Sequence, residues 1–132
     1  MKHLTLGLGL LAVLLAVGLL SLWLTVQYLD DTERPLRALT PHLEAGDSYA
    51  ALPLIVESRT VWESHRGYFC SLFSHTELEE VEQCFAALAA YAEQGELAEL
   101  RDAHTRLLAI LEHLRDMDKP CYYNILTVFR KA

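Results

Sequence analysis

The chain has 132 residues, of which 52% are apolar, and a formal net charge of −7. This length is enough for one modest domain. Lys2 is the only charged side chain before residue 30, so the remainder holds eighteen acidic and ten basic side chains, a net charge of −8. Nucleic acid binding depends on basic patches, and this composition therefore argues against a nucleic-acid partner.

Residues 4–29 contain no charged side chain. A helix needs about 20 apolar residues to cross a bilayer core, so the stretch predicts a transmembrane anchor in contact with the lipid bilayer. A cleaved signal peptide is the alternative, but Ala16-Val17-Gly18 is a poor cleavage site because the sequence after it stays apolar. We therefore expect a short tail at residues 1–3, an uncleaved anchor at residues 4–29 and an extramembrane domain at residues 30–132.

The charges beside the anchor bear on its orientation. Lys2 precedes the anchor, and Asp30 and Asp31 follow it. This arrangement favours a single-pass protein of the cell membrane with a cytoplasmic N-terminus and an extracytoplasmic C-terminal domain. Counting basic residues alone, Lys2 against Arg34 and Arg37, leaves the orientation open.

The segment after the anchor predicts a short or kinked helix over residues 33–45. Thr32 can cap this helix, and Pro35 suits its first turn. Pro41 interrupts its regularity, and Gly46 suits the position just past its end.

A second helix is expected to follow over residues 48–73, capped by Asp47 or Ser48. Pro53 lies near its start and is expected to delay or bend it. Its large apolar side chains recur mostly at intervals of three and four, which is the helical period. They are Leu52, Ile55, Val56, Trp62, Phe69 and Phe73.

Two more helices and a short terminal piece complete the predicted elements. Thr76 and Glu79 have the spacing of a capping box, and Gly95 suits the end of the helix that they begin. A fourth helix is expected over residues 96–115, and residues 121–129 are expected to form a short helix against the bundle. The apolar positions of the two long helices are Leu78, Val81, Phe85, Leu88 and Ala92, then Leu97, Leu100, Leu107, Leu111 and Leu114.

These elements predict an all-α protein, in which the transmembrane helix precedes a compact antiparallel helical bundle. A faint internal repeat suggests two αα-hairpins. Leu39, Glu44 and Gly46 recur 49 residues later as Leu88, Glu93 and Gly95. The pairs resemble tetratricopeptide units, but fewer than three repeats do not form a solenoid, so a bundle is the better prediction.

The stretch from Cys70 to Cys84 concentrates two thiols, His75 and several glutamates in fifteen residues. Zinc sites usually draw ligands from close Cys or His pairs, and this stretch has none with the usual spacing. We therefore interpret it as a corner between helices, with Cys70, His75 and Cys84 as the weaker metal-site alternative. Among the three cysteines, Cys121 can pair with Cys70 or Cys84, Cys70 can pair with Cys84, or all can remain free thiols.

No pattern in the sequence predicts an enzyme or a bound cofactor. His104 falls on an apolar helical stripe, where a histidine is usually a core residue with one hydrogen-bond partner. Trp62 is most simply a large core side chain. The chain has no glycine-rich phosphate loop and no nucleophile elbow.

The whole chain resembles DUF4363, a bacterial family of unknown function. The resemblance rests on the single apolar span, the helix with Trp62, the corner stretch Leu72–Leu78 and the ending Asn124-Ile125-Leu126. It implies a similar topology but no activity. It also suggests that Trp62, His75 and Asn124 form a packed polar cluster that fixes how the C-terminal tail docks.

The function expected from these features is that of a membrane-anchored helical module. Such a module would serve as a protein-interaction or scaffold domain at the bacterial cell envelope and bind another membrane or envelope protein. The alternative is an extracytoplasmic domain that binds a small ligand or a metal ion at the His75 corner.

Overall fold

A computed structural model describes residues 1–117, and this part of the chain is all-helical. It contains six helices and no strand. In chain order they are α1 (Lys2–Ala38), α2 (Thr40–Glu44), α3 (Ser48–Ser64), α4 (Arg66–Leu72), α5 (His75–Gln94) and α6 (Leu97–Met117). The all-α prediction is therefore confirmed, and the piece expected over residues 121–129 lies outside the described residues.

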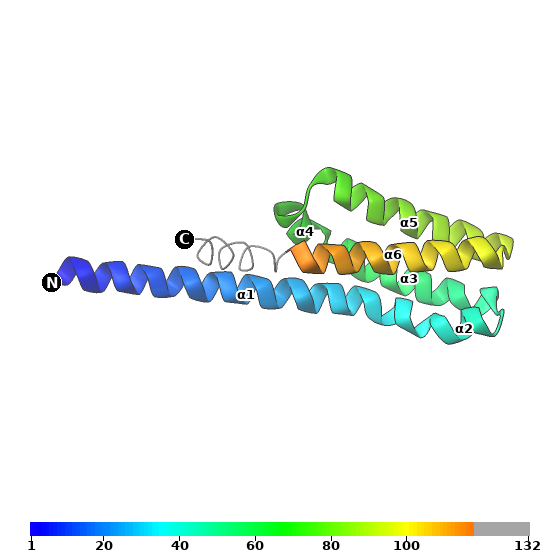
Figure 1. The fold of residues 1–132 in the computed structure, drawn as a ribbon, viewed down its shortest axis with the longest axis horizontal. Coiled ribbons are helices and arrows are strands. Elements are labelled where there is room, and N and C mark those ends of the chain that lie inside the picture. Colours follow the sequence, from blue (N-terminus) through cyan, green and yellow to red (C-terminus); the bar gives the residue numbers. More distant parts are fainter. Residues whose placement is uncertain (118–132) are drawn as a thin grey trace, which may run out of the picture.

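Helix α1 projects far beyond the other helices (Figure 1). Every side chain from Met1 to Leu20 is exposed, whereas buried positions begin at Thr25. At ~1.5 Å per residue the bare part is about 28 Å long, close to the thickness of a bilayer core. It is the one helix in residues 1–117 that is long and apolar enough to cross a membrane, and its most apolar window is 0% buried.

The second half of α1 packs with α3, α5 and α6 into a bundle, and consecutive long helices connect at alternate ends of it (Figure 1). One apolar core joins the four helices. Its largest fully buried side chains are Leu29, Leu36, Leu39, Ile55, Trp62, Phe69, Leu78, Phe85, Leu88, Leu100, Leu107 and Leu111. The helical stripes expected on α5 and α6 face this core, except that Leu97 is only partly buried, and on α3 Val56 is exposed.

The helix expected over residues 33–45 does not begin where we predicted. Thr32 lies inside α1, where its hydroxyl donates to the carbonyl oxygen of Tyr28 instead of capping a new helix. Pro35 also lies inside α1. The helix breaks only at Leu39, because Pro41 has no N–H to donate to the carbonyl four residues before it. The apolar segment expected to be an anchor and the bundle therefore share one helix, and the boundary expected at residue 29 falls within it.

The helix expected over residues 48–73 is divided at His65 into α3 and α4. Ser64, His65 and Gly67 are weak helix formers, so the local sequence allows a break here. A tertiary contact fixes it, because the His65 ring stacks on Tyr28 of α1 with centroids 3.8 Å apart. Asp47 caps the start of α3, as predicted.

Helix α5 has a capping box, but its residues are Ser74 and Glu77 rather than Thr76 and Glu79. Both pairs match the sequence pattern. The Ser74 cap places Phe73 just before the helix and Leu78 at its fourth position, and both side chains are buried in the core. This apolar pairing is a hydrophobic staple, which a cap at Thr76 would lack.

Two tight turns lie side by side at the end of the bundle away from the bare part of α1. Gly46 and Gly95 both have positive φ, +77° and +70°, which a residue with a Cβ rarely adopts. A Cβ on Gly46 would lie 4.0 Å from Leu97, and one on Gly95 would lie 3.9 Å from Ser48. The turn at Gly46 therefore packs against the start of α6, and the turn at Gly95 packs against the start of α3.

Candidate functional site

The residues of the metal-site alternative are not brought together. Cys70 is exposed on α4, and His75 is exposed as the first residue of α5. Cys84 is buried further along α5, and it and Cys70 are both free thiols. Within residues 1–117 no group of three or more His, Cys, Asp or Glu side chains has the arrangement to hold a metal ion.

The predicted cluster of Trp62, His75 and Asn124 is described only in part. Trp62 is fully buried and stacks on Phe69, with ring centroids 4.7 Å apart and planes at 19°. Its indole Nε1 has no hydrogen-bond partner among the described residues. Asn124 lies outside the described residues, so the docking role of the cluster stays a prediction.

His104 is a core residue with one hydrogen-bond partner, as the sequence predicted. Its side chain is 5% exposed, and Nε2 lies 2.6 Å from the carbonyl oxygen of Leu36. Leu36 belongs to the last turn of α1, and its carbonyl oxygen also accepts the N–H of Leu39 at 3.2 Å. The histidine therefore ties α6 to the end of α1.

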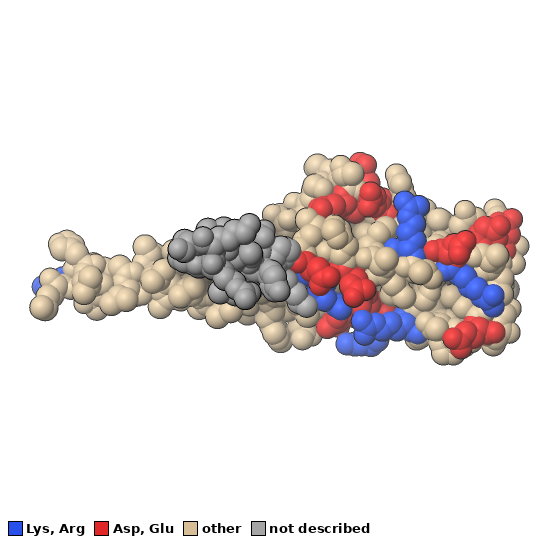
Figure 2. Space-filling view, viewed as in Figure 1, with Lys and Arg blue, Asp and Glu red and all other residues tan. Residues whose placement is uncertain are grey.

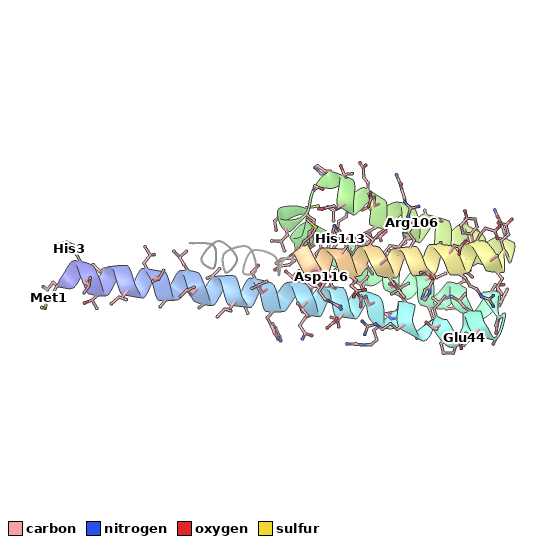
Figure 3. The ribbon with its side chains drawn as sticks, viewed as in Figure 1. Met1, His3, Glu44, Arg106, His113 and Asp116 are labelled. Carbon is pink, nitrogen blue, oxygen red and sulfur yellow. The ribbon has the colours of Figure 1, made fainter. Side chains whose placement is uncertain are left out.

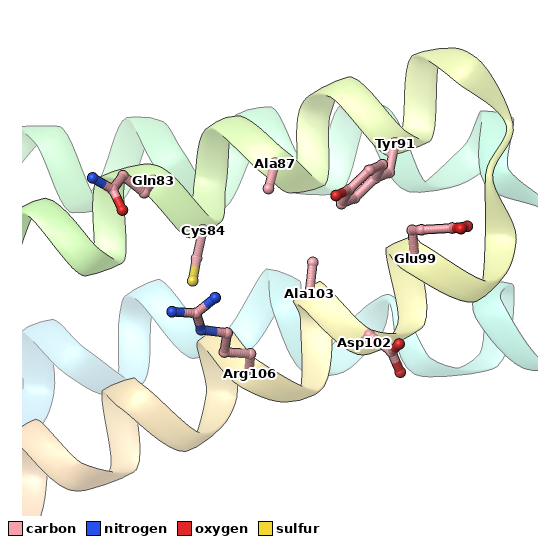
Figure 4. A pocket seen from close by; sticks show the side chains of 8 residues that line it. All are labelled: Gln83, Cys84, Ala87, Tyr91, Glu99, Asp102, Ala103 and Arg106. Atoms are coloured by element: carbon pink, nitrogen blue, oxygen red, sulfur yellow. The ribbon is translucent and has the colours of Figure 1, made fainter.

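A groove of about 400 Å³ runs between α5 and α6 (Figure 4). Small side chains, Ala87 and Ala103, lie along its middle. Arg106 lies toward one end, and Glu99 and Asp102 lie toward the other (Figure 4). The groove thus combines an apolar middle with opposite charges at its two ends.

Cys84 borders this groove, and its thiol points toward the Arg106 guanidinium (Figure 4). Burial raises the pKa of the Cys84 thiol above its ordinary value. The positive charge of Arg106 opposes this rise, and the negative charge of Glu80 adds to it. The thiol is therefore held in its neutral form and is a poor nucleophile.

A hydroxyl cluster joins α4 to α1 where the bare part of α1 ends. The Tyr68 hydroxyl donates to the carbonyl oxygen of Ser21 at 2.7 Å. It also lies 3.0 Å from the Ser21 hydroxyl and 2.9 Å from the Thr25 hydroxyl. Sequence analysis missed this cluster; its only local signal is the pair of hydroxyl residues spaced by one helical turn in an otherwise apolar run.

An ion cluster joins α1 to α6. The Glu33 side chain is only 4% exposed. Its Oε2 forms ion pairs with Nη2 of Arg37 at 2.6 Å and with Nη2 of Arg115 at 3.1 Å. Arg115 also pairs with Asp30. No sequence pattern predicts that Asp30 and Arg115, 85 positions apart, should pair, because the pairing depends on how the helices pack.

The charged side chains on the visible face gather over the bundle (Figure 2). On the bare part of α1, a charged side chain is seen only at the free end (Figure 2). Met1 and His3 mark that end, and Glu44 lies at the far end of the molecule (Figure 3). The molecule is therefore divided into a bare apolar helix and a charged bundle.

No protein-family model, curated protein or solved structure matches the chain. The resemblance to DUF4363 therefore stays a prediction. The following proposals depend on the geometry of this chain.

Proposed function

We propose that the chain is a single-pass membrane protein of the bacterial cell envelope whose helical bundle binds another membrane or envelope protein. The observation that carries this proposal is the form of α1. Its apolar half is bare over about the thickness of a bilayer core, and its other half belongs to the bundle core. The span therefore holds the bundle without an intervening linker.

A bare apolar surface of this size favours a lipid environment. The nineteen residues from Lys2 to Leu20 are exposed to water in the isolated molecule, and most are leucine, valine, alanine or glycine. Monomeric soluble proteins rarely expose apolar patches beyond a few hundred Å². Burial in a bilayer removes this surface from water, and the helix satisfies its own backbone hydrogen bonds there.

The anchor is tested by placing charge in the middle of the bare helix. Each lysine at the centre of a span costs about 3 kcal/mol on insertion scales, so Leu11→Lys with Leu14→Lys should move the protein out of the membrane fraction. The wild-type chain should resist extraction with alkaline carbonate. A matched variant, Tyr49→Lys, adds a cation at a 91% exposed site on the bundle and should stay in the membrane.

The mature chain gives an independent readout. Its mass should include the apolar stretch through Gly18. Recovery of wild-type protein in the soluble fraction, trimmed behind Gly18, would contradict the anchor.

In the proposed fold the bundle is an antiparallel pair of αα-hairpins, similar to a tetratricopeptide pair. The two glycine turns that pack against each other support this pairing. We place the N-terminus in the cytoplasm and the bundle outside the cell, from the charges of Lys2, Asp30 and Asp31. In a chain with Cys70→Ser, Cys84→Ala and Cys121→Ser, a cysteine at exposed position 49 should react with a membrane-impermeant maleimide in intact cells.

The groove between α5 and α6 is the proposed partner site. Amphipathic helices commonly dock by laying an apolar face into such a groove. Its two ends differ in charge, so the partner segment should carry an acidic side chain toward Arg106 and a basic one toward Glu99 and Asp102. The small side chains Ala87 and Ala103 leave room between them for apolar side chains of the partner.

The partner site is tested with a photoreactive amino acid in native membranes. Placed at Gln83 or Asp102 on the groove rim, it should give one shared adduct. Placed at Thr60, which is exposed on α3, it should not give that adduct. Arg106→Glu should weaken the adduct because it reverses the charge at one end of the groove. An equal yield from Thr60, or none from either rim position, would contradict the proposal.

A further inference from the structure

We propose that the corner formed by residues 67–76 is a second membrane contact, which lies in the interfacial layer of the same bilayer that α1 crosses. This corner comprises most of α4 and the start of α5. The inference rests on the proposed anchor and adds to it a lipid-facing surface on the bundle. The bundle would then lie directly on the membrane rather than project from it.

The position of the corner follows from its contacts with α1. A bilayer core takes up about 20 residues of helix, so a span that starts at Leu4 ends near Trp23. The hydroxyl of Tyr68 in α4 contacts Ser21 and Thr25, at the end of that span. Because these hydrogen bonds fix α4 beside α1, the corner lies at the depth of the membrane–water boundary.

The chemistry of the corner suits that depth. Residues 67–76 include no Asp, Glu, Lys or Arg. Leu72 is 41% exposed, and Trp23, which lies between Ser21 and Thr25 along α1, is 59% exposed. Tyrosine and tryptophan side chains favour the interface because one part of each ring system is apolar and another part forms hydrogen bonds.

The negative charge of the bundle argues against binding to anionic head groups. The extramembrane region is acidic, so anionic head groups would repel it. The corner should therefore be held by the exposed Leu72 side chain, together with Trp23 of α1, at the boundary between head groups and acyl chains. Salt should have little effect on its depth, because no basic patch contributes.

The test measures the depth of a nitroxide label on the full chain in vesicles of phosphatidylcholine and phosphatidylglycerol. The label is attached to native Cys70, which is exposed, after Cys84→Ala and Cys121→Ser. Oxygen concentrates in lipid and a nickel chelate stays in water, so the ratio of their collision rates reports depth. Labels at Leu14→Cys and Tyr49→Cys, each with Cys70→Ser, give the values for the span and for the far end of the bundle.

The expected oxygen-to-nickel ratio at Cys70 is several-fold above that at position 49 and below that at position 14, at both low and high salt. If position 14 lies in lipid but Cys70 matches position 49, the corner is in water; the inference then fails and the anchor stands. If position 14 is also in water, both proposals fail. A label at Cys70 that neither reagent reaches would show a protein cover and would overturn the inference as well.

A second variant guards against an effect of Cys84→Ala on folding. Leu72→Cys, with Cys70→Ser and native Cys84, places the label at another exposed position of the corner. Mass spectrometry establishes that only one site carries the label. The same intermediate ratio is expected there, and a ratio equal to that of position 49 would overturn the inference.

Discussion

Buried polar side chains attach α1 to the rest of the bundle at several points along its second half. Ser58 of α3 is fully buried and donates to the carbonyl oxygen of Thr32 at 2.6 Å. His104 of α6 contacts the carbonyl oxygen of Leu36 at the same distance. Both hydrogen bonds lie in apolar surroundings, where the loss of a hydrogen-bond partner lowers the stability of the fold. These residues therefore fix the register of α1 against its neighbours.

The contribution of His104 can be measured directly. His104→Ala should lower the free energy of unfolding by about 2–3 kcal/mol, because it removes a buried hydrogen bond and the packed atoms of the ring. Denaturant unfolding of the full chain in detergent micelles, followed by circular dichroism, measures the change. The matched control is Thr105→Ala at the exposed neighbouring position, which should change it by less than about 0.5 kcal/mol. Equal effects of the two substitutions would show that the hydrogen bond is unimportant.

The two described cysteines should differ in reactivity. Burial raises the pKa of Cys84, so at pH 8 a smaller fraction of it is thiolate than for an ordinary cysteine. Cys70 is exposed and should be alkylated first by iodoacetamide. As the pH rises toward the raised pKa of Cys84, its thiolate fraction and its alkylation rate should rise. Peptide mass spectrometry over a series of pH values measures both rates, and faster alkylation of Cys84 at pH 8 would contradict the prediction.

Helix α5 begins at the one position that provides both an N-cap and a buried apolar pair on either side of it. Two overlapping pairs in the sequence satisfy the capping-box pattern, and only Ser74 with Glu77 also places Phe73 and Leu78 in the core. The Glu77 carboxylate accepts the Ser74 N–H at 2.9 Å. Packing of the flanking residues thus decides between two equivalent local signals.

The choice of cap predicts unequal effects of two neighbouring hydroxyls. Ser74→Ala should lower the free energy of unfolding by about 1 kcal/mol, which is typical for the loss of an N-cap. Thr76→Ala is the matched control and should have an effect within about 0.5 kcal/mol, because that side chain is exposed and does not cap the helix. The same unfolding measurement applies, and a larger loss from Thr76→Ala would place the cap two residues later than we describe.

At the scale of the whole molecule, the main feature is the continuity of α1 from the bare segment into the bundle core. The ion cluster of Glu33, Arg37 and Arg115 lies where α1 meets α6, and Glu33 is almost fully buried there. A buried carboxylate that loses a cationic partner is strongly destabilising. The cluster therefore couples α1 to α6, the last described helix.

Arg115→Ala should lower the free energy of unfolding by about 2 kcal/mol; the value is below that of a fully buried pair because the Arg115 side chain is 19% exposed. After Arg115→Ala the buried Glu33 carboxylate keeps only Arg37 as a partner. The double variant with Glu33→Gln should recover part of the loss, because it removes that buried charge. Arg34→Ala is the control: this side chain is 77% exposed and pairs only with Asp31 among the described contacts, so its removal should cost less than about 0.5 kcal/mol. If the double variant is no more stable than Arg115→Ala, the buried carboxylate is not the cause.

The sequence alone determined the helical class, the apolar span and most of the core positions, because these depend on local periodicity and on the absence of charge. Leu78, Val81, Phe85 and Leu88 are buried as their spacing indicates. The position of Gly95 at the end of α5 was also predictable, since a positive φ favours glycine.

Only the tertiary structure decided where helices begin and end and which polar groups meet. The sequence predicts a new helix after Thr32, yet this stretch continues α1, because Thr32, Glu33 and Leu36 are buried where α1 packs against α3 and α6. The contacts of Tyr68, His104 and Arg115 join residues 43 to 85 positions apart. The sequence pattern shows the period of each helix, but it does not show which polar groups of different helices will meet. Those pairs form only when the helices pack.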